Sequence, residues 1–312
     1  MSNYFDKKDL FLEPKVNQYG SHMVMTNVTK PTKTKYINLD TKFSDDFNYN
    51  RCGNSYSNSI ESYTFTLPER LTEVKSMKVL SVEIPMSIYN ISTSLGNNFF
   101  KVVNNTTSAS SMIIVDPSNY TIAGLQDEIN NKIALLTTLS YTDVSSNFSN
   151  LTALGLDTYT VFFDTDIFGN FDKYNFRSKL GWALGFRDQS YNITPSTNTS
   201  SESFIDLSNP RYLFLVVDEF NNCVQNTFIS PVNGSLMNKK ILARISVDKT
   251  LYPFGTILHS YENYGSLVSD TRYYSGGKVD IQKLNVQLVN EYGFPMNLNG
   301  LDFEFIIEVI FE

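Results

Sequence analysis

The chain has 312 residues, of which 41% are apolar and 14% aromatic, and its formal net charge is −7. An acidic balance argues against a dedicated nucleic-acid binder, because such proteins usually present a basic surface. Charged residues make up only 18%, which is low for a coiled coil or helical bundle, and the abundant Phe and Tyr favour half-buried strands. We therefore expect an all-β protein, long enough for one large domain or two small ones.

The first 35 residues show no sustained hydrophobic periodicity and are mildly basic, with six lysines against three acidic residues. We predict an extended N-terminal arm over residues 1–35, followed by one domain over residues 36–312. Apolar residues scattered among the lysines indicate burial against another chain, and the alternative is a solvated tail. The candidate interface residues of the arm are Phe5, Phe11, Tyr19 and Lys30.

Residues 71–91 alternate with the period of two that is typical of a half-buried strand. Short strands are expected before it at residues 36–40 and 63–67, the second ending at Pro68. The long run should carry a bend or bulge near Ser76. Its two predicted faces consist of Val74, Leu80, Val82 and Ile84 on one side and Lys75, Met77, Val79, Ser81 and Glu83 on the other.

The clearest strand lies at the C-terminal end, where Phe303, Phe305 and Ile307 alternate with residues of the opposite face. We expect these three side chains to be buried and this strand to pair with residues 71–91. Pairing of an early strand with the last one is typical of Greek-key sandwiches and jelly rolls. The predicted fold is therefore an antiparallel jelly-roll β-sandwich with one inserted amphipathic helix and the extended arm.

That helix is predicted over residues 121–136, where Ile122, Leu125, Ile129 and Ile133 recur every three or four positions and Thr121 can act as the N-cap. The Ser/Thr/Asn-rich residues 190–203 predict a loop. Further strands are expected at residues 99–103, 112–115, 159–163, 211–217, 241–247, 255–259 and 279–289, the last with a bulge near Lys283.

Residue patterns that carry catalysis are poorly represented. The two histidines and two cysteines show no metal-ligand spacing. The acidic stretch from Asp164 resembles a calcium loop only faintly, because Phe168 and Asn175 stand where oxygen ligands belong. A phosphate-binding glycine loop and a nucleophile elbow are missing, as is an apolar run of transmembrane length. We expect no catalytic residue, no metal and no cofactor.

Residues 252–277 concentrate tyrosines around an arginine, and both residue types are favoured in the buried centres of protein interfaces. The alternative is that these tyrosines cover the end of the sandwich. The candidate interface residues here are Tyr261, Tyr264, Arg272, Tyr273 and Tyr274.

Several phrases of the sequence resemble one family. They are LPERLTEVKSMKVLSVEIPMSIYNIS at 67–92, NNFF at 97–100, YTIAGLQDEIN at 120–130, LGWALGF at 180–186, PRYLFLVVDEFNN at 210–222 and YPFGTILHSYENYGSLVSDTRYYSGGKVDIQKLNVQLVNEYGFPMNLNGLDFEF at 252–305. Together they resemble the minor capsid proteins of nucleocytoplasmic large DNA viruses and the penton-type single jelly-roll proteins of related viruses. The resemblance spans residues 67–312 and leaves the arm uncovered.

The resemblance implies a structural, non-enzymatic role in an icosahedral capsid, cementing or underlying the major capsid shell. The implied partners are the major capsid protein and other minor capsid proteins, with multiple copies per virion, which would assemble in the host cytoplasm. It implies no nucleic-acid binding, and proximity to an inner membrane without insertion. The alternative is a vertex (penton-type) module or a carbohydrate- or receptor-binding jelly roll.

Overall fold

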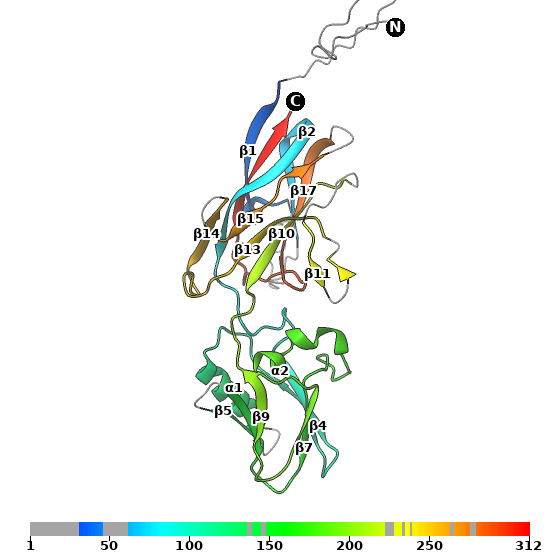
Figure 1. Cartoon of the computed structure of the whole chain (residues 1–312), viewed down its shortest axis with the longest axis vertical. Coiled ribbons are helices and arrows are strands. Elements are labelled where there is room, and N and C mark those ends of the chain that lie inside the picture. Colours follow the sequence, from blue (N-terminus) through cyan, green and yellow to red (C-terminus); the bar gives the residue numbers. More distant parts are fainter. Residues whose placement is uncertain are drawn as a thin grey trace, which may run out of the picture.

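The computed structural model describes residues 31–45, 62–135, 139–144, 148–221, 228–232, 235–237, 239–262, 265–274 and 279–312. Figure 1 shows two bodies stacked along the long axis, with the strands nearest the two chain ends side by side at the far end of the upper body. The predicted arm residues Phe5, Phe11, Tyr19 and Lys30, together with Tyr264, lie outside the described residues.

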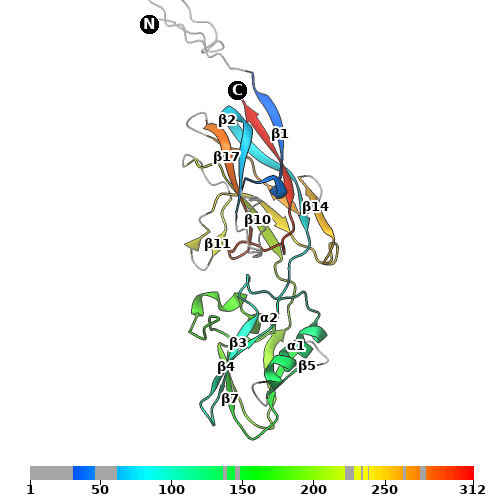
Figure 2. The same ribbon diagram turned by 180° about the vertical axis from the view of Figure 1, so that it is seen from behind.

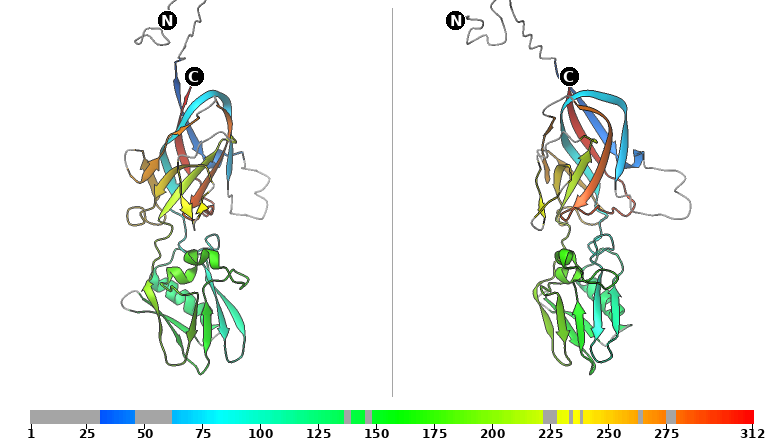
Figure 3. Two further views of the ribbon diagram at one scale, coloured as in Figure 1. Left: turned by 45° about the vertical axis from the view of Figure 1, so that its right-hand side comes forward. Right: turned by 90° about the vertical axis from the view of Figure 1, so that its right-hand side faces the viewer.

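The upper body is organised around β2 (Tyr63–Pro85), a strand of 23 residues that serves both of its layers. Its first half pairs with β17 (Val279–Asn290), and its second half pairs with β18 (Glu304–Phe311), β14 (Ile257–Tyr261) and β16 (Arg272–Tyr273). Between the halves Glu73 adopts a positive φ of 58°, and its N–H donates to the Asp280 carboxylate over 3.1 Å. The cyan strand β2 arches over the top of the body (Figure 3).

The expected break at Pro68 is therefore wrong, since one strand runs through it. The β17 partners jump from Leu71 to Thr66, so Pro68 lies where the ladder to β17 is already interrupted, and its ring is exposed. Proline lacks a backbone N–H, and here no ladder hydrogen bond is lost.

One layer of the upper body consists of β1 (Lys33–Asp40), β18, the second half of β2, and β14. The other consists of the first half of β2, β17, β10 (Tyr212–Asp218), β13 (Ile241–Ser246) and β15 (Leu267–Ser269). All these pairings are antiparallel, and the apolar side chains between the layers form one cluster. The predicted antiparallel jelly-roll sandwich is confirmed, as is the pairing of β2 with the last strand. Phe303, Phe305 and Ile307 are buried.

Two bulges set which β2 side chains enter this core. The β18 partners skip one β2 residue beside Ser76, as predicted, and another at Leu80. The second bulge overturns part of the predicted alternation, because it turns Val79 inward and leaves Leu80 half-buried. A one-residue insertion in a strand exchanges its two faces, which is why the pattern shifts there.

The lower body is the chain between β2 and β10. One sheet has the order β4 (Ser110–Ile114), β3 (Phe99–Asn104), β7 (Tyr159–Phe162), β8 (Ser190–Ile193), and the other the order β5 (Leu139–Val144), β6 (Phe148–Ala153), β9 (Thr199–Phe204). Figure 2 shows α1 (Ile122–Ala134) beside β5. These elements enclose a hydrophobic cluster of their own. The lower body also contains α2 (Leu180–Ala183) and a short 3-10 helix at Lys173–Ser178. A short 3-10 helix at Thr41–Phe43 and the hairpin of β11 (Pro231–Val232) and β12 (Ser235–Leu236) belong to the upper body.

Helix α1 confirms the one amphipathic helix that the sequence predicts. Leu125, Ile129 and Ile133 are buried, and the Thr121 hydroxyl accepts the Gly124 N–H over 3.2 Å. The prediction of a loop at residues 190–203 is wrong, because β8 and β9 form there. Their polar side chains pair across strands, as in the 2.8 Å hydrogen bond from the Thr160 hydroxyl to Asn192.

Candidate interaction surface

The outer face of the β14–β2–β18–β1 layer carries four rows of side chains that run across the strands. Residues directly opposite each other in paired strands project from the same face. We use "outer face" for these rows. The rows are His259–Glu83–Glu304–Asp40, Tyr261–Ser81–Ile306–Asn38, Lys78–Glu308–Tyr36 and Tyr273–Ser76–Ile310–Thr34.

The middle of the outer face carries tyrosines and aliphatic side chains, interrupted by the one charged row of a lysine and a glutamate. Tyr261 is 52% exposed, and Tyr273 and Tyr36 are each 64% exposed. Ile306 and Ile310 lie between them and are half-buried. Tyrosines of this kind offer a large contact area with a polar tip and are enriched at protein interfaces.

One end of the outer face is acidic. Glu304 stands opposite both Glu83 and Asp40, and His259 Nδ1 lies 3.3 Å from Glu83 Oε1. Partial burial, and then the hydrogen bond and repulsion from Glu83, raise the pKa of Glu304 above its usual value. Lys42 already pairs with Asp40 over 2.8 Å. Like charges placed directly opposite in a sheet are destabilising, so the remaining carboxylates, Glu83 and Glu304, favour a partner that brings positive charge.

A cavity of about 240 Å³ opens beside the acidic row. Lys42, Asp302 and Ile257 contribute to its lining. The Asp302 carboxylate accepts a hydrogen bond from the Thr41 hydroxyl over 2.9 Å, which fixes the rim of the cavity to the 3-10 helix after β1. The acidic end is therefore hollowed, whereas the aromatic middle projects from the sheet.

Arg272 and Tyr274 are not on this surface, which corrects their prediction as interface residues. Arg272 stands opposite Met77 and is 1% exposed, so it points into the sandwich while its neighbour Tyr273 points outward. Its guanidinium donates to the Val217 carbonyl and the Glu219 carboxylate, each over 2.7 Å. Tyr274 is buried as well. Both side chains therefore hold the interior of this chain together.

The acidic stretch at residues 164–170 is held by hydrogen bonds within the segment itself. The Asp166 carboxylate accepts the N–H groups of Phe168 and Asn170 over 2.9 and 2.8 Å, and these bonds lower its pKa. Within the described residues, no group of three or more His, Cys, Asp or Glu side chains could hold a metal ion. The same part of the chain has no helix long and apolar enough to cross a membrane.

Sequence reasoning missed Asp40, Glu83 and Glu304 as site residues. They are separated by up to 264 positions and meet only through the strand register. A signal was nevertheless present: Glu83 and Glu304 are each acidic residues within apolar-rich strands, where a charge on the solvent side marks the outward face.

No family model matches this chain, and no curated protein matches it. Among solved structures it is similar to one titled "Crystal structure of SeMet-labeled mavirus penton protein", with a TM-score of 0.40 and 10% sequence identity. That alignment covers 90% of this chain and 99% of the penton chain.

Proposed function

We propose that this chain is a structural minor capsid protein of a large icosahedral virus, which binds neighbouring subunits through its outer face. The observation that carries the proposal is the outer face itself, where exposed tyrosines adjoin a row of carboxylates on a rigid sheet. Its side chains point away from the hydrophobic core of the chain. A sheet face that contacts only solvent rarely concentrates exposed aromatic side chains in this way. The sequence resemblance to minor capsid proteins supports the same role.

The chemistry of the outer face indicates what it binds. The aromatic middle fits apolar side chains, and the acidic end fits lysine or arginine. The N-terminal arm of a neighbouring copy has this composition, with Phe5, Phe11 and Tyr19 among lysines that include Lys7 and Lys30. We propose that this arm is the occupant, and that burial against the outer face offsets the cost of ordering it.

Particle incorporation tests the outer face. In the double variant Tyr261→Ala/Tyr273→Ala the chain should fold, because both side chains are exposed, yet enter particles poorly. The matched control is Leu156→Ala on the lower body, where the side chain is 95% exposed. Equal incorporation of the double variant and the control, measured by quantitative mass spectrometry of purified particles, would contradict the proposal.

A further inference from the structure

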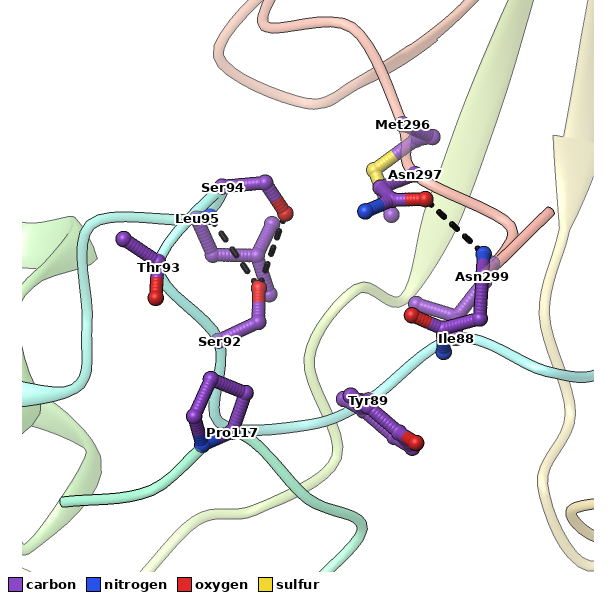
Figure 4. A pocket seen from close by; sticks show the side chains of 10 residues that line it. All are labelled: Ile88, Tyr89, Ser92, Thr93, Ser94, Leu95, Pro117, Met296, Asn297 and Asn299. Carbon is purple, nitrogen blue, oxygen red and sulfur yellow. Dashed lines mark hydrogen bonds between the residues drawn. The ribbon is translucent and has the colours of Figure 1, made fainter. Parts of the chain in front are cut away.

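A cavity of about 230 Å³ lies at the junction of the two bodies (Figure 4). One wall comes from the segment that leaves β2, including Tyr89 and Ser92–Leu95, and the facing wall comes from the loop before β18, including Met296, Asn297 and Asn299. Pro117 of the lower body completes it. The cavity therefore belongs to neither body alone.

The described lining combines polar and apolar side chains, none of which is charged. Figure 4 shows the hydroxyls of Ser92, Thr93 and Ser94 on one side and the amides of Asn297 and Asn299 on the other. None of these described lining residues bears a formal charge. A charged ligand would therefore lose water without gaining a counter-charge, which is unfavourable. Hydroxyls and amides both donate and accept, so they suit a ligand whose own groups do both.

An aromatic ring stands at the edge of the cavity. The rings of Tyr89 and Phe254 are stacked, with centroids 5.9 Å apart and an interplanar angle of 20°. Tyr89 is half-buried, so part of its surface remains open. A flat, supported ring beside hydroxyl and amide groups fits a ligand with one apolar face and a rim of hydroxyls.

Both walls are held in place before any ligand arrives. The Ser87 hydroxyl donates to the Leu298 carbonyl over 2.6 Å, and Asn299 N–H donates to Asn297 Oδ1 over 2.8 Å. On the other wall the buried Asn97 accepts the Ser92 N–H over 2.8 Å and donates to the Asn90 carbonyl over 2.7 Å. Pre-formed walls lower the entropic cost of binding a small ligand.

We propose that the junction cavity binds a neutral pyranose unit of a glycan. The sugar ring would lie against Tyr89, with its hydroxyls bonded to the serine and threonine wall and to the two asparagines. Its volume suits a single sugar unit, being somewhat below the usual range for drug-sized ligands of about 300–1,000 Å³. This inference does not depend on the capsid role.

The experiment uses the full chain and a panel of methyl glycosides of glucose, galactose, mannose and N-acetylglucosamine, observed by saturation-transfer NMR. At least one should receive saturation, strongest at the C–H protons of one ring face. Glucuronic acid and sialic acid should receive less, because the cavity offers no counter-charge. Tyr89→Ala should weaken binding about tenfold or more, equivalent to ~1.4 kcal/mol, while Tyr89→Phe should retain most of it.

Two further variants separate the cavity from the rest of the surface. Ser94→Phe places a ring in the cavity from an exposed position and should abolish binding, whereas Tyr261→Ala on the outer face should leave it unchanged. Thermal melting confirms that each variant is folded. If none of the neutral glycosides binds the wild-type chain, or if binding persists in folded Ser94→Phe protein, the cavity is not a sugar site.

Discussion

At the scale of single residues, the buried ion pair between Arg272 and Glu219 shows how strongly one side chain can depend on another. Both are almost fully buried, and the guanidinium also donates to the Lys240 carbonyl over 3.0 Å. Attraction between two buried charges roughly offsets the cost of removing them from water, but a single charge left behind has no such compensation.

We predict that Arg272→Met destabilises the protein by about 3–5 kcal/mol, because Glu219 is left buried and unpaired. The double variant Arg272→Met/Glu219→Met should recover a large part of that loss. Urea unfolding of the wild type, both single variants and the double variant gives the coupling energy between the two positions. Additive effects of the two single substitutions would show that the pair is not coupled.

Glu304 predicts a dependence of stability on pH. Asp40, Glu83 and Asp302, with Lys42 and His259, are the charged or titratable groups around it. Because its pKa is raised in the folded state, the folded protein holds that proton more tightly than the unfolded chain. Stability from this group is therefore present below the unfolded pKa and falls as pH rises through the folded value.

The variant Glu304→Gln should consequently be more stable than wild type at neutral pH and should lose this advantage in acid. The measurement is the free energy of unfolding of both proteins across acidic to neutral pH. A difference between them that stays constant with pH would show that repulsion within the row is not the cause.

At the scale of elements, β18 lies between β1 and β2 in one layer. Its side chains alternate between the core and the solvent-facing side. Phe305 is 1% exposed and stacks on Phe303, with ring centroids 6.1 Å apart, whereas the adjacent Ile306 projects onto the outer face. The two neighbours are both large and apolar but occupy opposite sides of the sheet, so their substitutions contrast a core position with an outward-facing one.

Phe305→Ala should cost about 3–5 kcal/mol, because a cavity remains where the ring packed. Ile306→Ala should cost much less, since its side chain faces outward and is only half-buried. Chemical denaturation of both variants checks the contrast. Similar losses at the two positions would mean that the register of β18 differs from the one described.

Local pattern was enough to predict β18 and α1, because their apolar side chains repeat within a few residues. It failed at Leu80, where the bulge exists only in relation to β18, and at residues 190–203, where polar strands are stabilised by their partners. It also failed to separate Arg272 from Tyr273, although adjacent strand residues point to opposite faces. The acidic row and the junction cavity required long-range register, which one sequence does not display.

At the scale of the whole molecule, the proposed assembly predicts that the arm is needed for the protein to enter particles. Deleting residues 1–30 should leave the folded body intact and reduce its entry into particles. Incorporation of the full-length chain should also fall at high salt, because screening weakens attraction between the arm lysines and the acidic end of the outer face. Normal incorporation of the deleted chain, at either salt concentration, would show that the arm is a solvated tail.

The pairing of β1 with β18 also gives the molecule a mechanical direction. The two strands match over eight residue pairs, from Lys33–Phe311 to Asp40–Glu304, and the lower body hangs from the opposite end of the sandwich (Figure 1). A pull between the arm and the lower body enters at Lys33 and leaves through the two connections to the lower body, past Pro85 and before Tyr212. It loads the β1–β18 and β18–β2 ladders in shear, so that their perpendicular hydrogen bonds share the force together. A pull on the two chain ends would instead open the Lys33–Phe311 pair first and unzip the ladder one rung at a time. The protein is thus built to resist tension along its long axis and to yield when its two ends are drawn apart.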